Sequence, residues 1–328
     1  MVAVTVLTAL SVAAQEPVEV QALRRAFDEA YRLEDWDEAI EIGLDLVDLV
    51  PRSVEQYNLA CVYALSGDAR SALRWLERSA ANGFYQLSQL ESDADLDIVR
   101  DLPGYRGVRL RVARNLDHHQ EILRKEAAAT PPLIVVPKSR GEGGKRPLLV
   151  VLHGYGDHAA RYLAVWGPAA RRFGAILAVP SGAQRVGSGR GWGSVDQAGV
   201  IVQLTVEYVK ERYDFDQDRV ILAGFSQGGF MAMALALRYP DRFVGVISMA
   251  GPYVPEIDFP PPAGNDDPRY YFMVGSLDRL FKQVRQAATD FEEAGYETRL
   301  RVVPETPHDF PRAARMELGR ALNFVLGD

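Results

Sequence analysis

The sequence predicts a chain of two parts, an all-α helical region followed by an α/β domain with a mostly parallel sheet. A helical spacing of apolar residues runs from Val18 to Ile42 without glycine or proline. Beyond residue 132, short apolar strands alternate with helical patterns, which is typical of a parallel sheet covered on both faces. The length of 328 residues suits about two domains.

Charge and composition exclude several classes of partner. Residues 15–125 hold 21 acidic and 14 basic residues, whereas residues 126–328 hold 23 of each. Neither part carries a dominant basic patch, so we predict no nucleic-acid partner. No apolar run reaches the roughly 18–20 residues of a membrane span, so we predict no integral membrane segment. The single cysteine, Cys61, excludes an intrachain disulfide, and its apolar neighbours indicate a buried core thiol.

The first fourteen residues, MVAVTVLTALSVAA, form an uncharged apolar stretch that ends in small residues. This pattern predicts a secretory signal peptide over residues 1–14, with Ala14 as the last residue removed, and therefore export to the periplasm or the medium. A positively charged start is missing. The alternative is a short N-terminal helix or strand in a cytoplasmic protein.

Residues 15–125 are predicted to form a helical domain with an internal repeat. Residues 33–39 are echoed by residues 66–72, so that Ala39 and Ala72 stand 33 residues apart. With Pro51 and Tyr63, this pattern resembles tetratricopeptide repeats over about residues 20–85, although the first unit lacks the expected Trp, Leu and Gly. The resemblance implies a protein or peptide partner on a concave face. The alternative is a helical cap that packs on the second domain.

Residues 126–328 are predicted to form the second domain. Its first part, at 126–146, is a turn-rich stretch that contains the short strand Leu133–Val136. Further strands are predicted at Pro147–Leu152, Ala175–Val179, Val220–Ala223, Phe243–Ser248, Tyr270–Val274 and Thr298–Val303. Helices are predicted between and after them, at 159–172, 196–212, 227–238, 279–294 and 311–326.

A nucleophile motif follows the strand Val220–Ala223. The sequence GFSQGG at 224–229 fits G-x-S-x-G and stands between that strand and a predicted helix, which is the context the motif requires. The chain must turn so sharply that only small residues fit at Gly224 and Gly228. Ser226 is therefore the candidate nucleophile, and the alternative is an ordinary glycine-rich turn.

A second loop, LHGYGD at 152–157, follows the strand Pro147–Leu152. Its glycines let the backbone approach a substrate carbonyl, and an oxyanion hole of this type takes one backbone N–H from such a loop and one from the residue after the serine. We therefore predict the N–H groups of Tyr155 and Gln227 as the two donors. His153 stands too early in the chain to serve as the base, so we interpret it as a structural residue.

The base and the acid are expected after the last two strands. Of the five histidines, only His308 follows the last strand, and the chain order serine, acid, histidine then points to Asp278 in GSLD at 275–278. Asp278 would orient the His308 ring and stabilise its charged form. Asp309 is a rival by proximity, but neighbouring side chains on a loop rarely face each other.

These motifs together resemble the α/β-hydrolase superfamily over residues 132–328, and within it the phospholipase/carboxylesterase group. The matching stretches are LHGYGD at 152–157, GFSQGG at 224–229, GSLD at 275–278 and PHDF at 307–310. The resemblance implies a Ser226, Asp278 and His308 triad that hydrolyses small-molecule carboxylic esters or thioesters. The group often carries Trp, Phe and Asp where this chain has Gly191, Trp192 and Gly193. The sequence therefore does not specify the acyl group of the substrate.

Two other functions stay open at this point. A serine peptidase uses the same triad, and a binding protein could use the repeats for recruitment and the second domain as a scaffold. No metal site is predicted, because His118 and His119 are adjacent and project in different directions on a helix. The glycine-rich run at 187–193 lacks the ending of a phosphate loop, and no cofactor is predicted.

Overall fold

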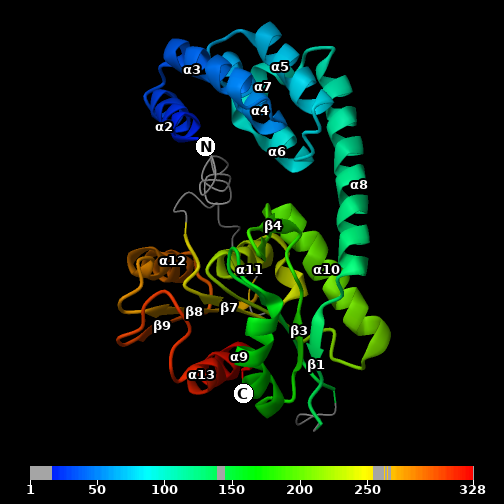
Figure 1. Ribbon diagram of the computed structural model, residues 1–328, viewed down its shortest axis with the longest axis vertical. Coiled ribbons are helices and arrows are strands. Elements are labelled where there is room, and N and C mark those ends of the chain that lie inside the picture. Colours follow the sequence, from blue (N-terminus) through cyan, green and yellow to red (C-terminus); the bar gives the residue numbers. More distant parts are fainter. Residues whose placement is uncertain (1–16, 139–144, 254–261, 263, 265–266, 328) are drawn as a thin grey trace. The chain divides into compact units, whose positions relative to one another are not determined.

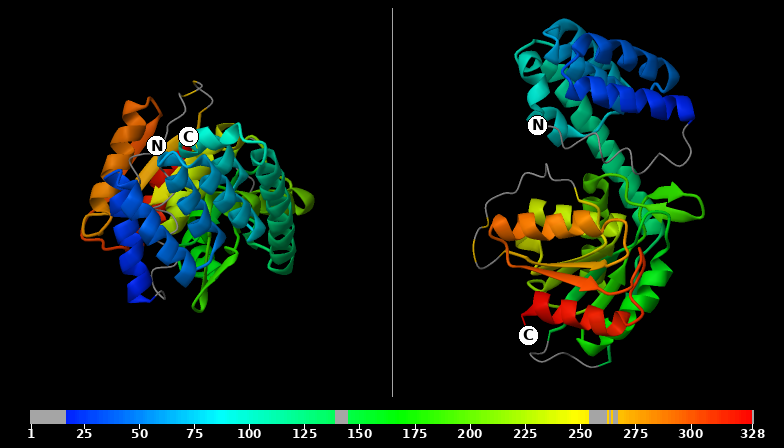
Figure 2. Two further views of the ribbon diagram at one scale, coloured as in Figure 1. Left: turned by 90° about the horizontal axis from the view of Figure 1, so that it is seen from above. Right: turned by 90° about the vertical axis from the view of Figure 1, so that its left-hand side faces the viewer.

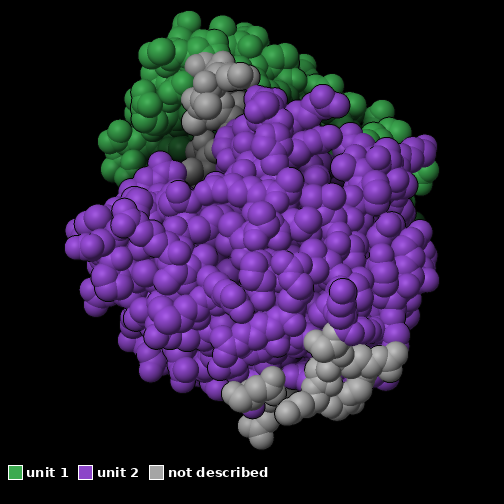
Figure 3. All heavy atoms as spheres, turned by 60° about the horizontal axis from the view of Figure 1, so that its bottom comes forward, with its two compact units in different colours: residues 1–122 green, residues 123–328 purple. Residues whose placement is uncertain are grey.

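The computed structural model describes residues 17–138, 145–253, 262, 264 and 267–327 (Figure 1). The chain divides into two compact units, residues 1–122 and 123–328, which are coloured separately in Figure 3. The division falls inside one continuous helix, which also contains the boundary predicted after residue 125. The proposed signal peptide at 1–14 lies outside the described residues.

The first unit is built from helices alone among its described residues, as predicted. In chain order they are α2 Val18–Arg32, α3 Trp36–Leu49, α4 Ser53–Leu65, α5 Ala69–Ala81, α6 Leu87–Ser92, the 3-10 turn η1 Ala94–Leu96, α7 Asp97–Arg100 and α8 Tyr105–Ala129, of which residues 123–129 belong to the second unit. None of the helices in the part of the chain that the structure describes is long and apolar enough to cross a membrane.

The 33-residue repeat of the sequence reappears as a repeat of backbone conformations. Glu34 and Gly67 both have positive φ angles, of 58° and 91°. The next residues, Asp35 and Asp68, cap α3 and α5 by accepting hydrogen bonds from backbone N–H groups three residues on. Ala39 and Ala72 are both fully buried, and so small side chains occupy equivalent helix contacts. The tetratricopeptide assignment itself stays a prediction.

The single cysteine lies in the core of this helical unit. Cys61 is buried, as predicted, and burial together with Asp93 raises the pKa of its thiol. Among the described residues, the ligand atoms of Cys61, Asp93 and Asp95 come within 4.8 Å of one another. The Tyr57 hydroxyl donates to the Asp93 carboxylate at 2.7 Å, and the Tyr31 hydroxyl donates to Asp95. Each carboxylate thus accepts a hydrogen bond from a tyrosine, and we interpret the cluster as a polar part of the helical core.

The second unit contains a seven-stranded sheet of the α/β-hydrolase fold, as predicted. The strands are β1 Leu133–Val135, β2 Leu148–Leu152, β3 Ile176–Val179, β6 Val220–Phe225, β7 Gly245–Met249, β8 Arg269–Gly275 and β9 Thr298–Val303. They lie in the order β1-β3-β2-β6-β7-β8-β9. All neighbours pair in parallel except β1, which runs antiparallel to β3. Every residue of β2, β3, β6 and β7 is buried, because helices cover both faces.

Five helices form the two layers around this sheet (Figures 1 and 2). They are α9 Ala159–Arg172, α10 Val195–Arg212, α11 Gln227–Arg238, α12 Phe281–Glu293 and α13 Ala314–Leu326, with the short turn η2 Pro240–Arg242 between α11 and β7. Helices α9 and α13 cover one face and contact each other, while α10, α11 and α12 cover the opposite face. Trp166 of α9 and Leu322 of α13 pack with the strands in one buried apolar cluster.

A hairpin in the second unit was not predicted. A small antiparallel hairpin, β4 Gln184–Val186 and β5 Gly189–Gly191, occupies the stretch that the sequence presents as a glycine-rich run. Strands of three residues give too little alternation to detect. The second strand of this hairpin pairs with the loop after β2.

The units should fold separately. Among the described residues, one apolar cluster of the sheet domain draws its buried members from residues 149–325, and two other clusters lie within residues 20–112. We therefore expect a chain that begins at Leu123 to show native-like circular dichroism and a cooperative thermal transition. Aggregation or loss of cooperativity in that fragment, with the full-length chain as control, would contradict this.

Candidate active site

Ser226 sits at the sharp turn between β6 and α11. Its backbone angles are φ 53° and ψ −120°, a region that residues other than glycine rarely occupy. The Ser226 N–H donates to the carbonyl of Met249 at 2.8 Å, which ties the turn to the end of β7. Helix α11 begins at the next residue, Gln227. The positive φ is the conformation that lifts a serine hydroxyl clear of a sheet edge, as the motif predicts.

The two glycines that flank the serine are required by close backbone contacts. A Cβ atom on Gly224 would lie 2.1 Å from the carbonyl oxygen of Gly228, and one on Gly228 would lie 2.2 Å from that of Leu152. No real Cβ contact is that short. Glycine at these positions therefore serves the sharp turn and also lets the loop after β2 approach the start of α11.

Ser226, His308 and Asp278 form one hydrogen-bonded chain, although they are far apart in the sequence. The Nε2 atom of His308 lies 3.0 Å from the Ser226 hydroxyl oxygen, and its Nδ1 atom lies 2.9 Å from a carboxylate oxygen of Asp278. The carboxylate accepts, so Nδ1 carries the proton and Nε2 is left to accept from the serine. The Asp278 side chain is 1% exposed and that of His308 21% exposed, which leaves the serine end open to a substrate.

The loops that carry the acid and the base are joined to each other. The Leu277 N–H donates to the carbonyl of Thr306 at 3.0 Å, and the Glu305 N–H donates to the Ser276 hydroxyl at 2.9 Å. A Cβ on Gly275 would lie 2.0 Å from the Thr306 oxygen, so only glycine permits this approach. The Leu280 N–H donates to Asp278 at 2.8 Å and fixes the carboxylate further.

The rival acid lies elsewhere. Asp309 binds the guanidinium of Arg161, and its side chain is 54% exposed. The structure thus brings Asp278, and not Asp309, against His308.

The two predicted oxyanion donors come from segments that the fold holds together. Strands β2 and β6 pair so that Leu152 stands beside Gly224. The loop with Tyr155 therefore follows the strand next to the serine turn. Gln227 opens α11, whose first N–H groups have no partner within the helix. The side chain of Gln227 accepts a hydrogen bond from the Trp192 N–H at 3.2 Å. The donor role of both residues stays a prediction.

His153 has the structural role that the sequence suggested. It is fully buried, its Nε2 accepts from the Gly182 N–H at 3.0 Å, and its Nδ1 donates to the carbonyl of Gly154 at 2.8 Å. Both contacts fit the neutral ring alone, and burial lowers its pKa below the ordinary value of 6.5. A neutral, doubly bonded histidine braces the loop after β2 and is not available as a base.

The hairpin β4–β5, which the sequence analysis did not predict, also contacts the loop after β2. The Gly156 N–H donates to the Arg190 carbonyl at 2.9 Å, and the Arg190 N–H donates to the Asp157 carbonyl at 3.0 Å. A Cβ on Gly189 would lie 2.0 Å from the oxygen of Gly156. The alternating glycines at 189 and 191 are the one signal in the sequence that could have indicated this contact.

Trp192 is part of the same support. Its side chain is fully buried, and its Nε1 donates to the carbonyl of His153 at 2.7 Å. The tryptophan therefore packs against the loop after β2 and does not offer its ring to solvent as a substrate contact.

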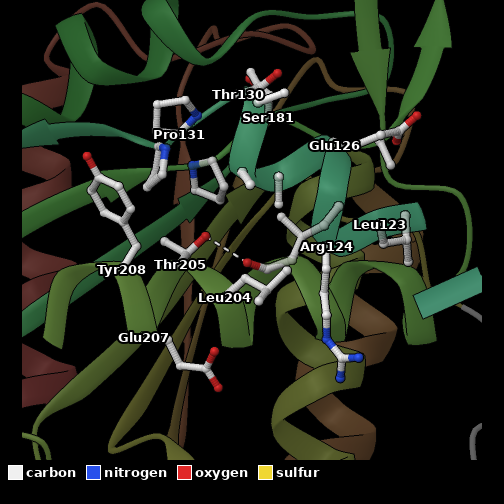
Figure 4. Close-up of a pocket in the computed structure, with 18 of the residues that line it drawn as sticks. Leu123, Arg124, Glu126, Thr130, Pro131, Ser181, Leu204, Thr205, Glu207 and Tyr208 are labelled. Carbon is white, nitrogen blue, oxygen red and sulfur yellow. Dashed lines mark hydrogen bonds between the residues drawn. The ribbon is translucent and has the colours of Figure 1, made fainter. Parts of the chain in front are cut away.

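A cavity of the second unit lies apart from Ser226, His308 and Asp278. It has a volume of about 490 Å³ and is lined by residues 123–132, the segment 180–190 and α10 (Figure 4). In it the Thr205 hydroxyl donates to the Ile201 carbonyl at 2.7 Å. Ser226, Asp278 and His308 are not among its lining residues, so the candidate active site is defined by hydrogen-bond geometry and not by cavity size.

Comparisons with known proteins agree with a hydrolytic site. Residues 200–303, less than half of the chain, match the family model described as "Putative esterase". A poly(3-hydroxybutyrate) depolymerase of Ralstonia pickettii is 32% identical over 126 residues, which cover 33% of this chain and 26% of that protein. "Putative esterase NocK" of Nocardia uniformis subsp. tsuyamanensis is 34% identical over 116 residues, covering 32% of this chain and 33% of that protein.

The match thus spans about a quarter to a third of the length of these two relatives. Among solved structures, a carboxylesterase from Mesorhizobium loti superposes with a TM-score of 0.50 at 19% identity, covering 59% of this chain and 94% of that one. At this identity the similarity shows the shared α/β-hydrolase fold.

Substitution of Gly275 tests the contact between the acid and base loops. In Gly275→Ala the new Cβ would meet the Thr306 backbone, so the His308 loop must shift. We expect a loss of about 1–3 kcal/mol in the free energy of unfolding, measured by urea denaturation. We also expect slower labelling of Ser226 by a fluorophosphonate. Gly107→Ala is the control, since nothing lies within 4 Å of a Cβ there; equal behaviour of the two variants would refute this account.

Proposed function

We propose that this chain is a serine hydrolase that cleaves carboxylic esters through an acyl-enzyme. The observation that carries the proposal is the hydrogen-bonded chain from Ser226 through His308 to the buried Asp278, at the carboxyl ends of β6, β8 and β9. This is the edge where open α/β sheets place their sites. The match to an esterase family over residues 200–303 supports the same chemistry.

The hydrogen-bonded chain supports a reaction in the following steps. His308 Nε2 takes the proton as Ser226 Oγ attacks the ester carbonyl, and the Asp278 carboxylate stabilises the imidazolium that forms. The N–H groups of Tyr155 and Gln227 would donate to the oxyanion of the tetrahedral intermediate. His308 then returns the proton to the leaving alcohol, and a water molecule that it activates releases the acid.

Carboxylic esters of small molecules are the proposed substrates. One relative is named for the depolymerisation of poly(3-hydroxybutyrate), which is itself a carboxylic ester. Thioesters and peptides would undergo the same attack, so substrate preference is the measurement that separates an esterase from a peptidase. A panel of p-nitrophenyl esters of increasing chain length, hydroxybutyrate oligomers, an acyl thioester and a peptide would decide it.

The helical unit carries a separate proposal. The 33-residue repeat of caps and buried alanines supports helix pairs of the tetratricopeptide type, and such repeats bind peptide segments of other proteins. Export of the protein through residues 1–14 is likewise a proposal from the sequence. N-terminal sequencing of the mature protein from its host would test it, with a start at Gln15 as the expected result.

The nucleophile can be tested directly. We expect Ser226→Ala to lower the hydrolysis of p-nitrophenyl acetate by at least about 10³-fold, because the members of a triad act as a unit. The same variant should lose labelling by a fluorophosphonate probe and keep its thermal midpoint. Residual activity above one tenth of the parent would disprove the assignment. A chain that is neither labelled nor active before mutation would favour the scaffold alternative.

The choice of acid has its own test. Asp278→Asn should reduce kcat by roughly 10³–10⁴-fold, because the amide can donate to Nδ1 and so favours the wrong tautomer of His308. Asp309→Asn serves as the matched control, since this aspartate binds Arg161 and not the histidine, and its effect should stay below about tenfold. The reverse ranking in steady-state kinetics would show that Asp309 is the acid.

A further inference from the structure

Arg161 joins two loops of the proposed site. It lies in the first turn of α9, and its guanidinium donates to the Asp157 carboxylate at 2.9 Å and also to that of Asp309. Asp157 ends the loop that carries Tyr155, and Asp309 directly follows His308. One side chain therefore bridges the segment with a predicted oxyanion donor and the segment with the base.

The next residue, Tyr162, reinforces the same connection. Its side chain is fully buried, and its hydroxyl accepts a hydrogen bond from the Gly154 N–H at 2.8 Å. The ring meets that of Phe310 edge to face, with centroids 5.3 Å apart. Tyr162 thus holds the backbone of the oxyanion loop on one side and the loop after His308 on the other.

Phe310 extends this contact to the reacting groups. The Arg161 guanidinium lies 5.2 Å from the centre of the Phe310 ring, and that ring lies 5.0 Å from the ring of Phe225. Phe225 precedes the serine and lies 4.9 Å from the His308 ring. A continuous path of packed side chains therefore runs from Arg161 to His308, whose Nε2 atom is hydrogen-bonded to Ser226.

The energetics indicate a role in geometry more than in stability. The side chains of Arg161 and Asp309 are 45% and 54% exposed, and an ion pair at that exposure contributes about 1 kcal/mol or less. Asp157 is better shielded. Burial alone would raise its pKa, but the His158 N–H and Arg161 outweigh burial and lower it, so Asp157 stays ionised and the bridge persists at neutral pH.

We propose that Arg161 is a positioning residue of the hydrolytic site, which holds the oxyanion loop and the His308 loop in register by binding Asp157 and Asp309 together. The inference rests on the proposed ester hydrolysis. Arg161 does not touch the reacting atoms. Its planar fork can engage two carboxylates at once, which a lysine ammonium on a flexible stem does less well.

The experiment compares Arg161→Gln, Arg161→Lys, Asp309→Asn and the double variant Arg161→Gln/Asp309→Asn in the full-length chain. Arg269→Gln is the matched control, because Arg269 pairs with Glu297 at 2.8 Å on the surface. Arg269 lies at the start of β8, whereas Asp278 follows the other end of that strand. Each variant is measured for kcat and KM on p-nitrophenyl acetate, for the inhibition constant of a boronic acid that forms a tetrahedral adduct with serine, and for its thermal midpoint.

For Arg161→Gln we expect kcat to fall by roughly tenfold and boronate affinity to fall in parallel, with KM within about twofold of the parent. Arg161→Lys should recover part of kcat. Asp309→Asn should lose less than Arg161→Gln, and the double variant should be no worse than Arg161→Gln, because both changes break the same bridge. The Arg269→Gln control should match the parent in kcat and boronate affinity.

Two results would overturn the proposal. One is an Arg161→Gln variant whose kcat and boronate affinity stay within twofold of the parent. The other is a variant whose thermal midpoint drops while kcat per folded molecule is unchanged, which would make Arg161 a stabilising residue only. A parent protein that shows no Ser226-dependent hydrolysis at all would instead refute the proposed function, and this inference with it.

Discussion

The site depends on a single constrained turn. Ser226 adopts a positive φ that costs about 1–3 kcal/mol for a residue with a side chain, and the surrounding contacts must hold it there. The hydrogen bond from its N–H to Met249 and the helix that starts at Gln227 provide that restraint. Gly224 and Gly228 leave the space in which the turn can form. The position of the serine hydroxyl is thus a property of the backbone on both sides of it.

The remaining parts of the site are arranged around this turn by short backbone approaches. Gly228 admits the end of β2, Gly275 admits the loop with Thr306, and Gly189 admits the loop at Gly156. At each place a glycine lets two loops pack with no side chain between them. The loops then bond to each other through backbone groups, and Ser226, His308 and Asp278, which come from three separate segments, are thereby held in one hydrogen-bonded chain.

Much of the site was predictable because its elements obey local rules. The G-x-S-x-G motif at a strand-to-helix junction identified Ser226, and the order of strands along the chain identified His308 and Asp278. The bounds of α9 and α11 agree with the apolar spacing in the sequence. The hairpin β4–β5 escaped prediction because it has three residues per strand, and its partner, the loop at Gly156, lies about thirty residues earlier. The end of α8 also differs, since the helix continues to Ala129 through a stretch of alanines that favours helix.

The sequence by itself determined the fold class, the succession of strands and helices, and the identity of the three residues that form the hydrogen-bonded chain. These follow from periodicity and from motifs of a few neighbouring residues, which are local properties. Only the tertiary structure decided that Asp309 binds Arg161, and that Trp192 and His153 support the loop after β2. Those outcomes depend on which segments meet in space, and the packing of distant side chains, unlike a turn or a helix, leaves no pattern in adjacent residues.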